Sequence, residues 1–445
     1  MQAAASAGTA AAPQRGGAWW MVAVLFALYV FSWVDRLIIA MLVTPIKAHL
    51  LLTDVQVSMV TSTSFAIFYA MFGLPLGWAA DRFSRRWIIF CGVGLWAAAT
   101  TACGYAQSYE QLLAARILVG VGEAALLPAA YSLIADAFPP HLLTRATSTF
   151  QMAGKVGSAT AFGLGGAAIA FATVYAGIHI PFHGPAHPWQ LVMTMVGVPG
   201  VVIALLVFTF PDPGRRRVAH ETGGEDGRAI IRDFVRGNWR LLGLMLVGTS
   251  CLAICGYSMT NWVPAYIERH FGWRPEQYGP ALSLMNIVSA LSLVVNGWIV
   301  DRLFARGVLD AHLRFYSWLI LACLPVIGYM FFAGNAWVFL ACYGVAQFIT
   351  VPFMVYVSSV LALICPGAVR SRMLAFFLFV FTMLGLGAGP AMIAGLTQYV
   401  FRDEAKLGYS LAIVVFAGAV VALAAFRMAL RYLSPTVAAQ QTAHG

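Results

Sequence analysis

Long apolar stretches, separated by short charged or Pro/Gly-rich breaks, make up most of the chain. Each stretch runs for about 20 residues or more, the length at which a helix crosses a hydrocarbon core of about 30 Å. The pattern therefore predicts an all-α membrane protein with twelve transmembrane helices. The predicted spans are residues 19–44, 56–80, 87–106, 111–137, 146–173, 189–210, 240–267, 279–300, 313–333, 336–364, 373–399 and 407–430.

The longest polar interruption, residues 211–238, is rich in glycine and charge and divides the spans into two groups of six. Two parallel six-helix repeats with a substrate site near the midplane between them are typical of transporters. We expect a flexible cytoplasmic lead over 1–18, a first six-helix half over 19–210, a cytoplasmic central loop over 211–238, a second six-helix half over 239–432 and a cytoplasmic tail over 433–445.

One short sequence ends the second predicted span of both halves: GWAADR at residues 77–82 recurs as GWIVDR at 297–302. Glycine allows close helix approach, and an Asp-Arg pair followed by more arginines can bind a neighbouring helix end and its dipole. Positive charge that served only membrane topology would not require the same pattern twice. We predict that both copies latch one conformation through Gly77, Asp81, Arg82, Arg85, Arg86, Gly297, Asp301 and Arg302.

Composition and charge placement agree with a membrane protein. The chain is 61% hydrophobic and 10% charged, with a mean hydropathy of +0.80, whereas soluble domains carry about 25% charged residues. Of the 27 basic residues, 19 flank spans on one side, 5 flank them on the other and 3 lie within spans. This positive-inside bias predicts both termini in the cytoplasm. The net charge of +10 thus reflects topology, and we expect no nucleic-acid partner.

The lead before the first span lacks the pattern of a cleaved signal peptide, so we expect no processing. All seven cysteines fall in or at the ends of apolar spans, which favours buried free thiols over disulfides.

Five ionisable residues are predicted well inside the membrane, where charges are costly and by default indicate function. Asp35 and Arg36 are adjacent in the first span, and Lys155 lies near mid-depth in the fifth. Arg116 and Glu123, in the fourth span, are almost two helical turns apart and point the same way, about 10 Å apart along the axis.

These charges have two interpretations. They could neutralise one another as structural ion pairs, whose disruption is destabilising. Alternatively, a carboxylate that can either pair with an arginine or take up a proton is suited to proton coupling.

The stretch GWAADRFSRR resembles the major facilitator superfamily pattern Gly-x-x-x-Asp-Arg-x-Gly-Arg-Arg, with Ser84 in place of the second glycine. Within that superfamily the chain is most similar to bacterial Spinster-type transporters. The stretches that carry this resemblance are VDRLIIAMLVTPIKAHL at 34–50, ARILVGVGEAALLPAAYSLIADAFPP at 115–140, NWVPAYIERHFGW at 261–273 and LGLGAGPAMIAGL at 384–396. The resemblance implies a proton-coupling set of Asp35, Glu123 and Arg116. We add Arg36, although it points about 100° away from Asp35 around the helix.

The predicted substrate site is built around cations and aromatic rings. Lys155 departs from the Spinster-type pattern and needs an anion, which is either Glu123 or an acidic group of the substrate. Near span ends, aromatic residues can instead belong to the interfacial belt. The predicted substrate-binding residues are Arg116, Lys155, Tyr69, Tyr131, Tyr257, Asn261 and Trp262.

Other chemistry is not indicated. His179, His183 and His187 recur every four residues, but intervening prolines exclude a regular helix, so we expect no metal site. GVGEAALLP lacks the ending of a nucleotide-binding loop. We expect no cofactor, with a proton gradient or simple facilitation driving transport.

The sequence therefore predicts a monomeric transporter, not an enzyme, in the bacterial inner membrane. Our first hypothesis is proton-coupled alternating-access transport, as a symporter, of an organic anion such as a carboxylate, aromatic carboxylates included. The alternative, implied by the resemblance, is export of lysophospholipid or sphingolipid-like amphiphiles. A hypothesis from another class is a non-transporting sensor or membrane enzyme, which would need a fused soluble domain or a nucleophile-base set.

Overall fold

The structure is a computed structural model that describes residues 15–180, 184–214, 225–350, 352–365 and 367–444. Within these ranges it contains twelve helices long and apolar enough to cross a membrane, which confirms the predicted fold class. Each predicted span overlaps one of them. The segments are Gly17–Met41, Asp54–Arg82, Arg85–Cys103, Tyr109–Ala137, Arg145–Val174, Pro188–Thr209, Ile230–Phe271, Pro275–Ala305, Ala311–Met330, Ala336–Ile364, Arg372–Phe401 and Glu404–Val437.

The first half runs through nine α-helices, one π-helical and one 3₁₀ segment, and two short strands. Its elements are α1 (Arg15–Met41), α2 (Val43–Leu50), α3 (Asp54–Ser58), η1 (Met59–Thr63), α4 (Ser64–Arg82), α5 (Arg85–Cys103), α6 (Tyr109–Glu123), α7 (Leu126–Ala137), α8 (Pro140–Val174), β1 (His179–Ile180), β2 (Gly184–Pro185), α9 (Pro188–Ile203) and η2 (Ala204–Thr209). The strands pair antiparallel, His179 with Pro185, in the loop where the histidine pattern was discounted; His183 lies outside the described residues.

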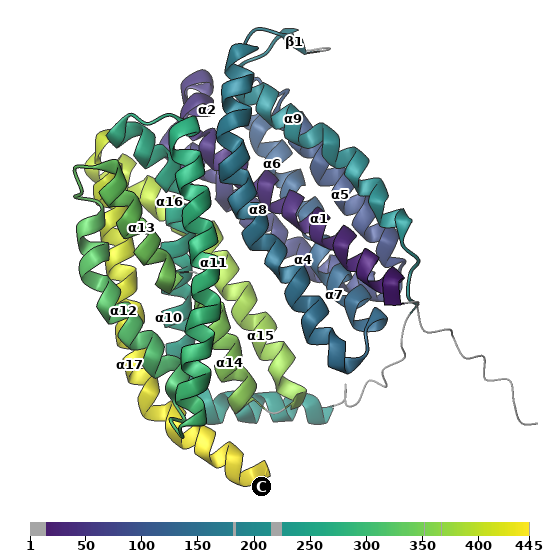
Figure 1. Ribbon diagram of the computed structural model, residues 1–445, viewed down its shortest axis with the longest axis vertical. Helices are drawn as coiled ribbons and strands as arrows, with labels where there is room; N and C mark the ends of the chain where they lie inside the picture. Colours follow the sequence, from purple (N-terminus) through teal and green to yellow (C-terminus); the bar gives the residue numbers. More distant parts are fainter. Residues whose placement is uncertain (1–14, 181–183, 215–224, 351, 366, 445) are drawn as a thin grey trace, which may run out of the picture.

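The second half contains eight α-helices, with two π-helical segments in its fifth span. Its elements are α10 (Glu225–Phe271), α11 (Pro275–Ala305), α12 (Ala311–Met330), α13 (Ala336–Thr350), α14 (Phe353–Ile364), α15 (Gly367–Phe381), η3 (Thr382–Ala388), α16 (Gly389–Gly395), η4 (Leu396–Phe401), η5 (Glu404–Lys406) and α17 (Leu407–His444). Helix α10 begins inside the predicted central loop and is broken at Asn238, where φ is −117° and ψ is 16°. In Figure 1 its first part lies across the lower end of the molecule.

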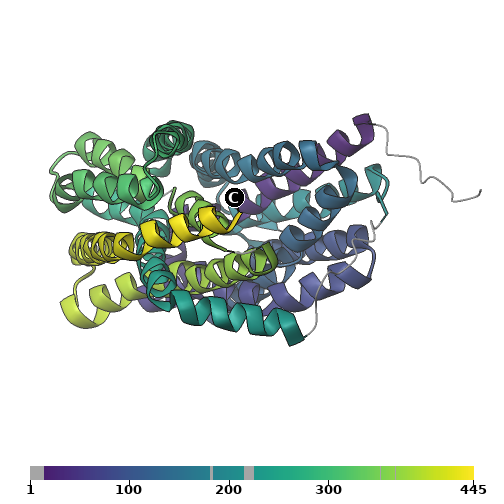
Figure 2. The ribbon, with the colours of Figure 1, turned by 90° about the horizontal axis from the view of Figure 1, so that it is seen from below.

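The two halves lie side by side, with α8 and α11 adjacent between them (Figure 1), and the view from below also separates the two groups of helices (Figure 2). In Figure 1 α17 ends at the bottom and α1 begins at the lower right, and we call this end of the molecule the terminal end. Helices α8 and α11 diverge toward that end. The opposite end, where the halves are joined, is called the closed end below.

Close backbone packing joins the halves at the closed end. A Cβ atom added at Gly166 of α8 would lie 2.4 Å from the carbonyl oxygen of Pro275, and one at Gly279 would lie 2.5 Å from that of Phe162. No side chain fits into such spaces without movement of the backbone. The largest buried apolar cluster continues across this contact, from Ile38 of α1 to α10 and α11.

Two π-helical segments face each other across the halves. The hydroxyl of Thr63, in η1, donates a hydrogen bond to the carbonyl of Gly387, in η3, at 2.8 Å. Wider π turns change the backbone hydrogen-bonding pattern and are frequent at functional sites. The carbonyl of Val60, also in η1, accepts a hydrogen bond from a functional candidate, Arg116.

Candidate functional site

Helix α6 carries two of the predicted site residues and ends at one of them. Its start is capped by Ser108, whose side chain accepts a hydrogen bond from the backbone N–H of Gln111. Its last residue is Glu123, after which two residues interrupt the helix before α7 begins at Leu126. The cap and the break thus place Glu123 at a helix end inside the protein, where it is 2% exposed.

The glycines around Glu123 allow neighbouring helices to approach it. A Cβ at Gly120 would lie 2.9 Å from the carbonyl oxygen of Phe65, in α4, and one at Gly122 would lie 2.7 Å from that of Gly92, in α5. The sequence Gly-x-Gly-Glu therefore packs α6 directly against α4 and α5.

Glu123 pairs with Arg36 of α1. The Nη2 atom of Arg36 donates to Oε2 of Glu123, and the hydroxyl of Ser32 donates to the same oxygen at 2.9 Å. The 100° offset between Asp35 and Arg36 places their side chains against different partners. The sequence indicated Arg36 as a member of the set, but it did not identify Ser32, which lies one turn before Arg36.

Asp35 and Arg116 form the other part of this charged cluster, and both are fully buried. The Nε atom of Arg116 donates to the carbonyl of Val60 at 3.2 Å, while its two terminal nitrogens have no hydrogen-bond partner in the described chain. Neither oxygen of Asp35 accepts a hydrogen bond from a described residue. The charge of Arg116 is close enough to interact with that of Asp35, and the hydroxyl of Thr100 lies nearby.

Aromatic rings surround the guanidinium of Arg36. Its Cζ atom lies 4.6 Å from the ring centre of Phe65, 5.2 Å from that of Trp33 and 5.3 Å from that of Tyr69. Phe65 and Tyr69 stack on each other at 5.5 Å. The predicted Tyr69 is thus a neighbour of Arg36, and the i, i+3 spacing of Trp33 and Arg36 and the i, i+4 spacing of Phe65 and Tyr69 could have identified the other rings.

Lys155, on α8, does not pair with Glu123. No carboxylate of the described residues lies within ion-pair distance of its Nζ atom, and its side chain is half-buried. One turn further along α8, the carbonyl of Ala159 accepts a hydrogen bond from Ser283 of α11 at 2.8 Å. Lys155 therefore lies on the side of α8 that faces the second half.

Of the remaining predicted substrate residues, Tyr131, Tyr257 and Asn261 lie on helices that contact the first-half cluster or α8, whereas Trp262 packs within the second half. Tyr131 receives a hydrogen bond from Gln151 of α8, and Tyr257 of α10 lies near Arg36 and packs against Gly385. Asn261 is 8% exposed, one turn from Tyr257. Trp262 instead is fully buried and donates to the carbonyl of Pro390 at 3.0 Å, a contact that holds α10 against α16. Its assignment to the substrate site stays a prediction.

The gating set makes contacts within the halves. Arg85 is buried and donates to Asp136 of α7, to Asp212 at 2.8 Å and to the carbonyl of Gly214 at 2.9 Å. Arg86 donates to the carbonyl of Phe208 at 3.0 Å. These bonds hold α5 against α7, against η2 and against the chain that follows η2. Both ion pairs of Arg85 lie within the first half.

The two copies of the repeat share a further contact. The Cζ atom of Arg82 lies 4.1 Å from the ring centre of Trp78, and that of Arg302 lies 4.5 Å from that of Trp298. Asp81 and Asp301 are exposed. A Cβ at Gly77 would contact Pro128 at 3.7 Å, whereas one at Gly297 would have open space. The role of the two copies as a latch that holds one conformation stays a prediction.

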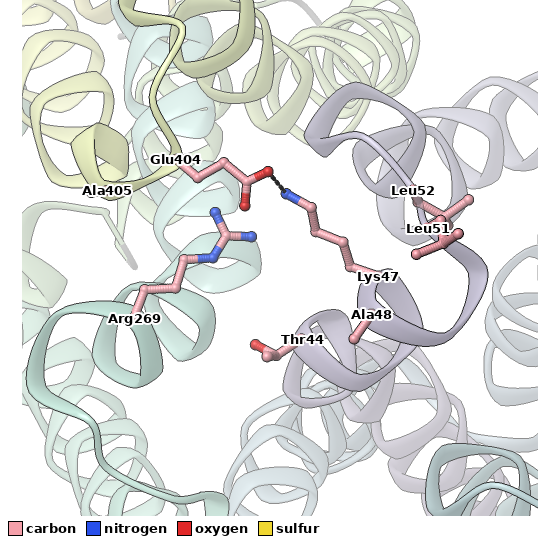
Figure 3. Close-up of a pocket in the computed structure, with 8 residues that line it drawn as sticks. All are labelled: Thr44, Lys47, Ala48, Leu51, Leu52, Arg269, Glu404 and Ala405. Atoms are coloured by element: carbon pink, nitrogen blue, oxygen red, sulfur yellow. Dashed lines mark ion pairs between the residues drawn. The ribbon is translucent and has the colours of Figure 1, made fainter.

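Ion pairs between the halves lie at the closed end instead, around residues that the sequence interpretation missed. Arg269 of α10 binds the buried Asp54 of α3 with two hydrogen bonds, of 3.0 and 3.1 Å. Lys47 of α2 bridges Asp54, at 2.5 Å, and Glu404 of η5, at 2.6 Å. Lys47, Arg269 and Glu404 line a pocket of about 660 Å³ (Figure 3). The sequence held one signal for Asp54: Thr53 and Gln56 have the spacing of a capping box, which predicts a helix beginning at Asp54.

Two six-helix halves that meet around buried charges are the architecture of a multi-pass membrane transporter. A family model described as Major Facilitator Superfamily matches residues 25–390. The chain belongs to the major facilitator superfamily, and the fold and family are those of membrane transporters.

Individual relatives and structures refine this comparison. The chain is 27% identical over 321 residues to an MFS-type efflux pump of Mycolicibacterium smegmatis, an alignment that covers 71% of this chain and 68% of the pump. It is 26% identical over 297 residues to the cis,cis-muconate transport protein of Acinetobacter baylyi, covering 64% of this chain and 68% of that protein. The fold resembles that of a bacterial homologue of the human lysosomal transporter Spinster, with a TM-score of 0.76, 21% identity and coverage of 96% and 99% of the two chains. The predicted Spinster-type resemblance is confirmed.

Proposed function

We propose that this protein is a proton-coupled secondary transporter that moves an organic anion, such as a carboxylate, across the bacterial inner membrane by alternating access. The observation that carries the proposal is the balance of charge at mid-depth. Arg36, Arg116 and Lys155 supply three positive charges, whereas Asp35 and Glu123 supply two negative charges when both are ionised. A singly charged anion neutralises the excess, which is costly to leave uncompensated inside a membrane.

Lys155 is the first contact for the substrate's anionic group in this proposal. Lys155 lies on the side of α8 that faces the second half and has no carboxylate partner among the residues described, so an acidic ligand can bind it without breaking an existing ion pair. Arg36 is the second contact, because its pair with Glu123 can be exchanged for a pair with the substrate. The relative named for transport of cis,cis-muconate, an organic dicarboxylate, supports an organic anion as cargo.

Proton coupling follows from the two carboxylates. Protonation of Glu123 would remove its charge and release Arg36 to the substrate, while Ser32 could still hold the carboxyl group through its hydroxyl. Asp35 accepts no hydrogen bond from the described residues, and an ionised carboxylate in that condition is costly to bury. We therefore assign Asp35 and Glu123 as the proton-carrying groups and Arg116 as the cation that holds Asp35 in place.

Purified protein in proteoliposomes with an internal pH indicator tests the proposal. A panel of carboxylates and lysophospholipids is added from outside, and both internal pH and cargo content are followed for the wild type and for Glu123→Gln. We expect a carboxylate-dependent proton flux that Glu123→Gln abolishes. Cargo movement without proton movement would contradict the coupling, and movement of lysophospholipids alone would replace the organic anion by the amphiphile alternative.

A further inference from the structure

All ionisable residues at mid-depth come from the first half of the protein. The second half has no Asp, Glu, Lys or Arg within residues 241–267, 277–300, 315–363, 373–401 or 407–426. The side chains of α10 that face the charged cluster are neutral but polar. Tyr257 is close enough to Arg36 to interact with it electrostatically, and helix α10 contacts α1 directly. The two walls of the site therefore differ in chemistry.

Asn261 is one of the polar residues of the second wall with a side-chain atom that has no hydrogen-bond partner in the described part of the chain; Ser258 is another. Asn261 follows Tyr257 by four residues and so lies on the same face of α10. The side chain is 8% exposed, and its Nδ2 atom has no hydrogen-bond partner among the described residues. A buried amide that donates no hydrogen bond costs free energy. A ligand oxygen between the halves would remove that cost.

Neutral polar side chains continue behind this face, between α10 and α13. The Nε2 atom of Gln347 donates to the hydroxyl of Tyr343 at 2.9 Å, and the hydroxyl of Thr350 donates to Oε1 of Gln347 at 3.3 Å. Tyr343 also contacts Thr260 of α10, and all three α13 residues are buried. Because these groups satisfy one another, they hold the polar wall of the second half in a fixed arrangement.

We infer that the substrate is a hydroxylated monocarboxylate, bound with its carboxylate against the first half and its hydroxyl groups against Tyr257 and Asn261. The inference rests on the proposed function and specifies the chemistry of the substrate's uncharged part, which carries hydroxyl groups. When Asp35 and Glu123 are both ionised, one positive charge remains in excess, and one carboxylate bound at Lys155 balances it. An alkyl or acyl chain would leave Asn261 unpaired, and a site built to hydrogen-bond a hydroxyl discriminates strongly against analogues that lack it.

Gluconate and hexanoate are the matched probes for this inference, because both are six-carbon monocarboxylates and only gluconate carries hydroxyl groups. Their dissociation constants are measured by calorimetry on the purified full-length protein. We expect gluconate to bind at least about tenfold more tightly than hexanoate. Asn261→Leu should abolish that preference, whereas Lys155→Gln should weaken both acids alike.

Two further variants protect the test against misfolding. Ser258→Ala is the matched control: it removes a buried hydroxyl of the same helix that faces Gly389, within the second half, and should leave the preference unchanged. Asn261→Ser keeps a donor and should retain part of the preference. Equal binding of the two acids by the wild type, or an equal loss for both in Asn261→Leu, would overturn the inference while leaving anion transport intact. Binding of a lysophospholipid but of neither acid would overturn the proposed function as well.

Discussion

Arg269 of α10 binds the carboxylate of Asp54 of α3 with both terminal nitrogens, so one bidentate ion pair joins the two halves of the protein at its closed end. Asp54 is 3% exposed and receives a third hydrogen bond, from Lys47. Removing one partner of a buried ion pair is strongly destabilising because the other charge remains without compensation. The pair therefore stabilises the conformation in which this end is closed.

We predict that Asp54→Asn shifts the protein toward a conformation that is open at this end. Arg269 and Lys47 would then face each other without the carboxylate that neutralises both. Spin labels on cysteines at Leu51 and Ala405, which line the pocket from opposite halves, report the change in a background without the native cysteines. The distance distribution between the labels should move to longer values.

Glu404→Gln is the control for this prediction. Its carboxylate also pairs with Lys47, but the Glu404 side chain is 63% exposed, and exposed pairs contribute only about 0–1 kcal/mol. The label distances should stay as in the wild type. If Asp54→Asn also left them unchanged, the bidentate pair would not be a determinant of closure.

A second prediction concerns the pair between Arg36 and Glu123. Arg36→Leu should destabilise the protein by about 3–5 kcal/mol, because it leaves Glu123 buried without its cation. The double variant Arg36→Leu/Glu123→Leu should recover much of this loss. Unfolding of both variants in detergent, compared with each single change, measures the coupling. Losses that simply add would show that the two side chains do not depend on each other.

A third prediction is that replacing Lys155 affects substrate binding and leaves stability unchanged, in contrast to replacing Arg36. Since no described carboxylate pairs with Lys155, Lys155→Gln should leave the thermal unfolding temperature close to that of the wild type. The same change should weaken binding of a carboxylate substrate about tenfold or more, because a charged hydrogen bond is lost. Lys406→Gln, an exposed lysine at the closed end, is the control for loss of charge. A large fall in stability for Lys155→Gln alone would reveal a structural partner.

The fold could be predicted from sequence because span length and charge breaks depend on local composition. Membrane-spanning helices must satisfy their own backbone hydrogen bonds, so an apolar stretch of the right length has few alternatives. The irregular helical segments could not be predicted from the sequence. The π turns of η1 and η3 depend on contacts between the halves, such as that of Thr63 with Gly387, which no local pattern contains.

The charges inside the helix bundle could be predicted from the sequence, whereas the way they pair could not; their role as a transport site stays a prediction. Mid-span charge identified Asp35, Arg36, Arg116, Glu123 and Lys155, because ionisable residues are rare at that depth. Which cation binds Glu123 depends on how α1 and α6 cross, and spacing within one helix does not determine that. Asp54 and Arg269 were missed because charges near span ends usually belong to the membrane interface.

The last prediction concerns close packing at the closed end, where Gly166 of α8 meets the start of α11; Gly297, near the other end of α11, is the control position. A Cβ at Gly166 would lie 2.4 Å from the carbonyl oxygen of Pro275 and 3.1 Å from Cα of Glu276, all of it backbone of α11. Backbone at this distance can yield only if α8 and α11 separate. Gly166→Ala should therefore weaken contact between the halves and destabilise this conformation by about 1–3 kcal/mol, as overpacking does.

Gly297→Ala adds the same methyl group where no atom lies within 4 Å, so the change should leave the stability of this conformation close to that of the wild type. The spin-label pair at Leu51 and Ala405 separates the two effects: Gly166→Ala should lengthen the distance, and Gly297→Ala should not. Equal behaviour of both variants would mean that the helices at the closed end have room to move apart at no cost. In that case the ion pair between Asp54 and Arg269 would have to hold the end closed without support from backbone packing.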